Sequence, residues 1–309
     1  MSAPTKKPSA QQSKWLRPVL AVAGALLLLL ILVLLAKWFT GSTAGQSFLH
    51  DYPGRSELPA GAPVGIPAWL GWQHFLNVFF LVLIVRSGWQ VRTAKRPPAY
   101  WTRNNKGFIR TRNAPTKMSL DLWFHLTLDA LWVLNGLIFI ILLFATGQWT
   151  RIVPTSWDVF PNAVSAGIQY LSLNWPVENG WVNYNALQLL TYFVTVFIAA
   201  PLAILTGLRT SSAWPKKAAV NKIYPIEIAR AVHFPVMIYF VAFTLVHVTL
   251  VLATGALRNL NHMYGGSSDE NWIGFGIFAA SLAVIVAAWF LARPLFLRPI
   301  ASLTGKVSK

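Results

Sequence analysis

Residues 231–253 read AVHFPVMIYFVAFTLVHVTLVLA and contain no Lys, Arg, Asp or Glu. A helix needs about 20 mostly apolar residues to cross the hydrocarbon core of a bilayer, so this stretch predicts a transmembrane helix. Two histidines, His233 and His247, lie 14 residues apart within it. Fourteen steps of about 100° end within about 40° of the starting direction, so both imidazoles leave one face, about 21 Å apart along the axis. One helix can therefore supply one ligand to each of two sites stacked across a membrane.

The composition of the whole chain is that of a membrane protein. Hydrophobic residues make up 55% of its 309 residues and charged residues only 11%, whereas soluble domains average about 25% charged residues. This excludes a soluble enzyme, and the apolar content excludes a disordered chain. Five more stretches are apolar enough to span, namely Val19 to Ala36 and about 69–85, 122–145, 186–208 and 273–291. None alternates as barrel strands do, so we expect an all-α integral membrane bundle of six transmembrane helices.

The first span, Val19 to Ala36, follows a basic tail and therefore resembles a signal peptide. Its apolar run is longer than the roughly 7–15 residues of a signal h-region, which favours a retained anchor helix. Ser42–Thr43–Ala44 would allow cleavage, and this alternative stays open.

The distribution of charge predicts the topology. With a cytoplasmic N-terminus, the segments on the cytoplasmic side hold 22 of the 26 Lys and Arg residues, and six of the nine acids lie outside. Because basic loops stay in the cytoplasm, we expect both termini there, in a multi-pass protein of the cell inner (plasma) membrane. The net charge of +17 is then a signal of topology, and we expect no nucleic-acid partner. The basic connection 86–121 is expected to contact anionic membrane lipid.

Histidines are the candidate ligands, because the chain has six of them and no cysteine. Four lie within the predicted spans: His74, His125, His233 and His247. An ionisable side chain within a membrane helix marks a functional site by default. The alternative is a neutral histidine hydrogen-bonded between helices, which is adequate for one such residue and strained for four.

The predicted topology assigns a depth to each of these histidines. His74 follows the outer start of its span, and His125 follows the inner start of the next. In the fifth span His233 is inner and His247 outer, so we expect His74 to pair with His247 and His125 with His233. Two sites of two histidines each suit two haem b groups better than zinc or copper, since a small metal ion usually takes three or four protein ligands.

Three further residues have candidate roles near these pairs. Gly136 lies 11 residues after His125, on nearly the same face, where it either makes room for a porphyrin or packs helices together. Asp129 lies one turn after His125 and serves either proton exchange at a quinone site or a hydrogen bond to a neighbouring group. Asp121 is predicted to be an N-cap. His262, outside the membrane, either borders the outer haem or a docking surface, or is a solvated loop histidine.

The arrangement resembles the bacterial cytochrome b561 and Ni,Fe-hydrogenase-type cytochrome b superfamily, which includes the gamma-type membrane subunits of respiratory formate dehydrogenases. In that family a four-helix core carries one haem-ligating histidine on its first helix, one on its second and two on its fourth. The corresponding residues here are His74, His125, and His233 with His247. The resemblance implies a di-haem membrane subunit that works with a quinone and with a separate catalytic redox subunit, such as a molybdopterin oxidoreductase.

We therefore expect a cytoplasmic tail with an anchor helix (1–40), an extracytoplasmic linker (41–68), a four-helix di-haem core (69–265), and a sixth helix with a cytoplasmic tail (266–309). The expected function is to carry electrons across the membrane between a quinone or quinol and a partner oxidoreductase of a respiratory chain, rather than to act as a stand-alone catalyst. Two alternatives stay open: a transporter with a histidine pathway for protons or metal, and a self-contained quinone-linked oxidoreductase.

Overall fold

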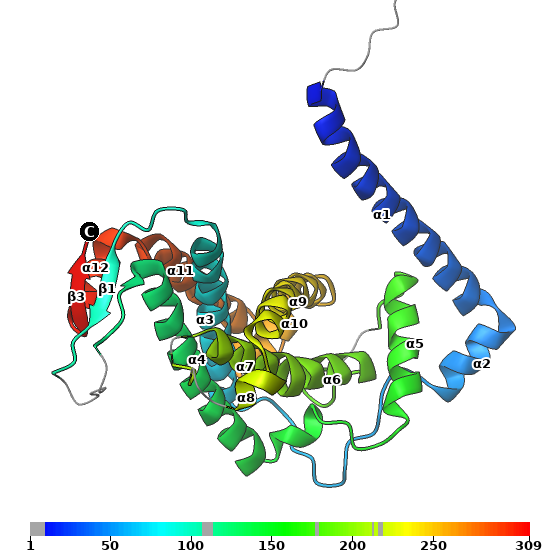
Figure 1. Cartoon of the computed structure of the whole chain (residues 1–309). Helices are drawn as coiled ribbons and strands as arrows, with labels where there is room; N and C mark the ends of the chain where they lie inside the picture. Colours follow the sequence, from blue (N-terminus) through cyan, green and yellow to red (C-terminus); the bar gives the residue numbers. More distant parts are fainter. Residues whose placement is uncertain (1–9, 107–113, 177–178, 212, 216–218) are drawn as a thin grey trace, which may run out of the picture. The chain divides into compact units, whose positions relative to one another are not determined.

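The computed structural model describes residues 10–309 apart from 107–113, 177–178, 212 and 216–218 (Figure 1). Several charges used in the topology prediction lie outside the described residues: Lys6, Lys7, Arg110, Arg112, Glu178, Lys216 and Lys217. The chain divides into two compact units. One consists of Met1–Glu57, Pro154–Glu178 and Tyr184–Leu190, and the other consists of Leu58–Val153, Asn179–Asn183 and Thr191–Lys309.

Six helices of the described residues are long and apolar enough to cross a membrane. They are Trp15–Gly41, Ala68–Thr93, Leu120–Ala145, Ala186–Thr210, Ile226–Ala253 and Ile273–Leu291. This confirms the predicted six-helix integral membrane bundle. Several helices run a few residues past the predicted apolar stretches, because polar residues at the membrane boundary continue the same helix.

The first unit contains α1 (Ala10–Gly41), α2 (Thr43–Asp51) and α5 (Val159–Leu171). The hydroxyl of Ser42 caps α2 by accepting a hydrogen bond from the Gly45 amide at 3.0 Å. α1 packs against α2 and α5. The predicted linker 41–68 thus includes a helix.

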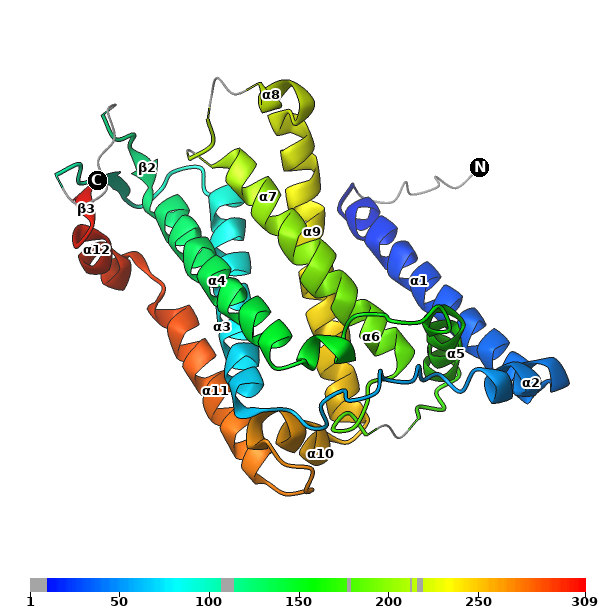
Figure 2. The ribbon, with the colours of Figure 1, turned by 90° about the horizontal axis from the view of Figure 1, so that it is seen from below.

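The second unit contains α3 (Ala68–Thr93), α4 (Leu120–Ala145), α9 (Ile226–Ala253) and α11 (Ile273–Leu291). The fourth span belongs to the first unit up to Leu190 and to the second unit from Thr191 onward. It changes form along its length, from α6 (Ala186–Phe193) through a π-helical turn, η2 (Val194–Ala199), to α7 (Ala200–Thr210). α3 packs on α4, and α7 packs on α9 (Figure 2).

The middle of the second unit is an aromatic and amide layer. The rings of Trp132 and Phe240 meet edge to face at 6.2 Å. The indole N–H of Trp132 and the amide of Asn135 both donate to Asn77 Oδ1. Phe240 lies halfway between His233 and His247 on α9, so this layer separates the levels of the two histidines.

A small antiparallel sheet, in the order β2-β1-β3, lies at one end of the second unit. β1 (Tyr100–Arg103) and β2 (Met118–Ser119) come from the basic connection, and β3 (Gly305–Ser308) comes from the C-terminal tail after α12 (Pro294–Ser302). Both segments therefore meet at one end, as the predicted topology requires. The sheet was not predicted, because its strands are very short and one of them comes from the far end of the chain.

The same end includes α8 (Val220–Ile223), while α10 (Ala256–Leu260) lies at the opposite end (Figure 2). A 3₁₀ turn, η1 (Gln148–Arg151), follows α4, and a π-helical turn, η3 (Asn261–Gly265), follows α10.

The start of α4 corrects one prediction. Ser119, not Asp121, is the N-cap, and its hydroxyl accepts a hydrogen bond from the Leu122 amide at 3.1 Å. Asp121 lies in the first turn and is only 9% exposed. Serine and aspartate are both good N-cap residues, so the sequence alone left two candidates two residues apart. The helix begins directly after β2, which places the Ser119 hydroxyl at the cap position.

Candidate functional site: two histidine pairs

The outer histidines face each other across the bundle. His74 of α3 and His247 of α9 have ring centres 6.2 Å apart, with the ring planes at 48°. An imidazole nitrogen lies about 2 Å from the metal it binds. Since the ring centre is roughly 1 Å further out, two imidazoles on opposite sides of one iron have centres roughly 6 Å apart. The spacing of this pair fits that arrangement.

Aromatic side chains surround the outer pair. Phe243 stacks on His247 at 5.5 Å, and Tyr192 meets His247 edge to face at 6.0 Å. Tyr264 places its hydroxyl 3.1 Å from His74 Nδ1. It belongs to η3, one of the π-helical turns that are frequent at functional sites. Burial raises the pKa of Tyr264 to about 12, so it stays a neutral partner for His74.

Each inner histidine contacts a hydroxyl of a neighbouring helix. His125 Nδ1 lies 3.0 Å from Ser87 Oγ, and His233 Nδ1 lies 2.8 Å from Thr206 Oγ1. Both hydroxyls donate to carbonyls of their own helices, Ser87 to Ile84 and Thr206 to Leu202.

These hydrogen bonds determine which ring nitrogen is protonated. A hydroxyl has only one proton to donate, so Ser87 and Thr206 accept from the imidazoles. His125 and His233 therefore carry their protons on Nδ1 and keep the lone pair of Nε2 free. Histidines that bind metals have this arrangement, with the remote nitrogen donating to a fixed acceptor.

Each of these hydroxyls is followed by a glycine that lies against the same histidine. A Cβ added at Gly88 would be 3.0 Å from His125 Cε1, and one added at Gly207 would be 3.4 Å from His233 Cε1. Neither Ser87–Gly88 nor Thr206–Gly207 was predicted from the sequence. A signal was present, because each is a hydroxyl–glycine dipeptide near the predicted cytoplasmic end of a span.

Asp129 lies beside the inner pair. Its Oδ2 is 3.6 Å from His125 Nε2, one turn earlier on α4. Electrostatic interactions link His233 to both Asp129 and His125. Within the described part of the chain, no three His, Asp or Glu side chains are grouped so that they could hold a metal ion.

The remaining candidates lie near the outer end. A Cβ on Gly136 would meet no atom within 4 Å, so there is open space beside it. His262 is only 3% exposed and its ring lies 5.7 Å from that of Trp181, so the solvated-loop alternative is wrong. Burial, together with the charges of Arg258 and Arg151, lowers the pKa of His262.

The fold and this site define a multi-pass helical membrane protein with half-buried histidines toward each end of one bundle. The chain is similar to YedZ1 of Azospira oryzae, whose name describes a protein-methionine-sulfoxide reductase subunit. The two are 28% identical over 196 residues, which cover 60% of this chain and 88% of the relative. No family model matches the chain, and no solved structure matches it.

Proposed function

We propose that this protein is a di-haem b-type cytochrome subunit that carries electrons across the inner membrane. Its electrons would pass between a quinone or quinol and a partner oxidoreductase of a respiratory chain. The observation that carries the proposal is the contact between Nδ1 of each inner histidine and a hydroxyl of the neighbouring helix, at 3.0 Å for His125 and 2.8 Å for His233, which leaves Nε2 to bind a metal. The outer pair supports it through the 6.2 Å spacing of its rings.

In this proposal His74 and His247 hold the outer haem, and His125 and His233 hold the inner one. The haems supply one-electron chemistry, while the chain binds them, orients the imidazoles and excludes water. Ser87 and Thr206 orient the inner rings, and Gly136 leaves room at the outer level. The haem-carrying core is residues 69–265, with the anchor segment 1–40, the linker 41–68 and the final helix and tail 266–309 around it.

A separate catalytic subunit is the proposed partner. The name of the Azospira relative describes a reductase subunit, which supports a partner that carries out the substrate chemistry. A molybdopterin oxidoreductase is the kind that the family resemblance implies.

The deciding experiment is a reduced-minus-oxidised spectrum of the full-length protein purified in detergent, together with a pyridine haemochrome assay. We expect Soret and α-band changes typical of haem b and two haems per chain. No spectral change, or a haem content far below two per chain, would refute the proposal.

The contact between His125 and Asp129 favours a second candidate, a transporter with a proton pathway. An imidazole and a carboxylate 3.6 Å apart could exchange a proton within the membrane. Proteoliposomes with a pH-sensitive dye inside distinguish the two functions. A pure electron carrier leaves an imposed pH gradient intact, whereas a proton pathway dissipates it and Asp129→Asn stops the flux.

A further inference from the structure

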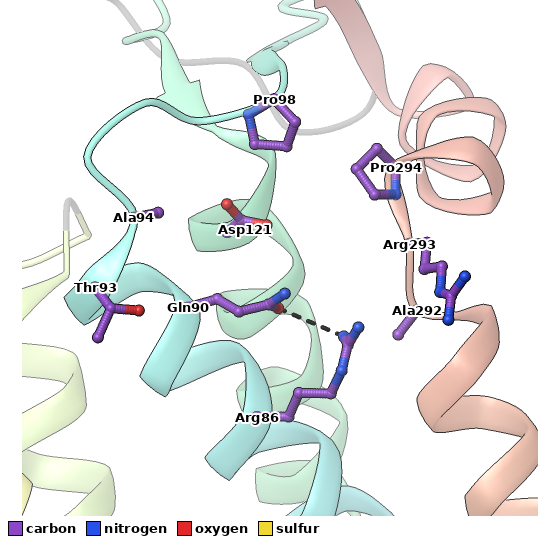
Figure 3. Close-up of a pocket in the computed structure, with 9 residues that line it drawn as sticks. All are labelled: Arg86, Gln90, Thr93, Ala94, Pro98, Asp121, Ala292, Arg293 and Pro294. Carbon is purple, nitrogen blue, oxygen red and sulfur yellow. Dashed lines mark hydrogen bonds between the residues drawn. The ribbon is translucent and has the colours of Figure 1, made fainter.

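A cavity of about 260 Å³ opens where α3, α4 and α12 come together, at the predicted cytoplasmic end of the second unit (Figure 3). Its lining includes Arg86, Gln90, Asp121, Ala292, Arg293 and Pro294. The cavity contains none of the four paired histidines, and the proposed haem sites do not account for it.

The charged groups of the cavity are held in place without being paired to one another. Arg86 donates to Gln90 Oε1 at 3.4 Å, and its guanidinium lies 5.2 Å from the ring centre of Trp289 on α11. The guanidinium of Arg293 likewise lies 5.7 Å from the ring centre of Phe290. Among the described residues, no ion pair within 4 Å joins either arginine to Asp121. At longer range Arg86 interacts electrostatically with both Asp121 and Arg293, so the three charged groups are near enough to contact one ligand.

The lining favours an amphipathic ring over a simple anion. Its walls are mostly apolar, from side chains such as Ala94, Pro98 and Ala292, while its polar groups are two guanidinium donors, an amide, a threonine hydroxyl and one carboxylate. A phosphate would be repelled by Asp121, which is almost fully buried. A quinone carbonyl accepts hydrogen bonds from guanidinium, and a quinol hydroxyl donates to carboxylate. An apolar cleft with a few convergent polar groups is the usual form of a small-molecule site.

We propose that this cavity binds the headgroup of a quinone or quinol. Arg86 and Arg293 donate to its oxygen atoms, and Asp121 accepts from its hydroxyl. This inference rests on the proposed function, and it assigns the contact with the quinone to Asp121 in place of Asp129.

The cavity is connected to the inner histidines through short stretches of chain. Arg86 precedes Ser87, which accepts the hydrogen bond of His125. Asp121 lies one turn before His125 on α4, whereas Asp129 lies one turn after it. A ring that contacts Asp121 in the cavity therefore lies about one helical turn from His125 along α4, on the side of α3 where Arg86 meets Trp289 of α11.

The test uses the full-length protein in detergent and an azido-decylbenzoquinone as the photoaffinity probe, with labelled peptides identified by mass spectrometry. We expect labelling within residues 86–98 or 289–296, competed by decylubiquinone. Arg86→Gln and Arg293→Gln should each reduce labelling about 10-fold, with Asp121→Asn as a third variant. The matched control is Arg92→Gln, since Arg92 is on the same helix but lies over Phe234, at 4.1 Å, and should label normally.

Three results would overturn the inference: labelling confined to other segments, labelling unchanged in both arginine variants, or labelling lost equally in the control. A fourth contrary result would come from native mass spectrometry. If Arg86→Gln removes a bound phosphatidylglycerol while quinone labelling persists, the cavity is a lipid headgroup site. Haem content is measured in the same samples. If haem is absent but the labelling is specific, only the proposed function is refuted. If the haem content is normal but the cavity is not labelled, only this site is refuted.

Discussion

The outer histidines, His74 and His247, face each other at 6.2 Å among aromatic rings, whereas each inner histidine lies against a hydroxyl and a glycine of the neighbouring helix. The outer pair has no carboxylate contact among the described ion pairs, while Asp129 approaches the inner pair. The outer imidazoles are thus held by packing of aromatic rings and by one tyrosine hydroxyl, at His74. The inner imidazoles are held by serine and threonine hydroxyls and by the close approach of a glycine. The two haems of the proposed function should therefore differ in potential and in sensitivity to mutation.

The largest expected effect separates the two pairs completely. His247→Ala should remove the outer haem and keep the inner one, and His233→Ala should do the reverse, because each iron loses one of its two protein ligands. The haem content should fall from two per chain to one in each variant. A content of two in either variant would contradict the pairing, and the spectra of the two variants should differ from each other.

Gly88→Ala should disturb the inner pair strongly. The new methyl group would lie 3.0 Å from His125 Cε1, so the ring or the helix must shift, at a cost of about 1–3 kcal/mol. We expect reduced inner haem content and a lower thermal midpoint. Gly207→Ala is the matched control, since its methyl would sit at 3.4 Å from His233, an ordinary contact. Equal effects of the two substitutions would contradict this account of the inner site.

Asp129→Asn tests the electrostatic difference between the pairs. An oxidised haem carries one more positive charge than a reduced one, and a nearby carboxylate stabilises the oxidised form. Removing the charge should raise the inner midpoint potential by roughly 100–200 mV, the Coulomb energy of a unit charge about 4–8 Å from the iron at an effective dielectric constant of about 20. A redox titration should show one component moving and the other fixed. Equal movement of both components would argue against a local effect.

Thr206→Val removes the acceptor for the Nδ1–H of His233 while keeping the shape of the side chain. A net hydrogen bond is worth about 1 kcal/mol, so we expect roughly a 5-fold loss of inner haem affinity and a shifted inner potential. Thr206→Ser retains the hydroxyl and should restore both quantities. If the serine variant behaves like the valine variant, the effect comes from packing and not from the hydrogen bond.

The smallest expected effect is a pH dependence at the outer end. His262 has a lowered pKa in the folded protein, so the unfolded chain binds its proton more readily. The contribution of His262 to stability is therefore complete above about pH 6.5, the value for an unperturbed histidine, and declines as the pH falls below it. Thermal midpoints measured between pH 5 and 8 should show this decline, and His262→Gln should reduce its slope. An identical slope in the variant would assign the dependence to other groups.

The sequence by itself determined the six spans, the end of the bundle at which each of the four membrane histidines lies, and the nearness of Asp129 to His125. These features depend on hydrophobic length, on charge asymmetry and on the helical repeat, and all three are local properties of the chain. The same spacing argument found His233 and His247 on one face because both belong to a single helix.

Only the tertiary structure decided which groups hold the imidazoles. Ser87 and His125 are 38 residues apart, Thr206 and His233 are 27 apart, and His74 and Tyr264 are 190 apart. Such contacts depend on how far each helix is rotated toward its neighbour, and a periodic pattern does not specify this. The sheet between the basic connection and the C-terminal tail, the two π-helical turns and the choice of Ser119 as the cap of α4 likewise depend on packing between distant segments.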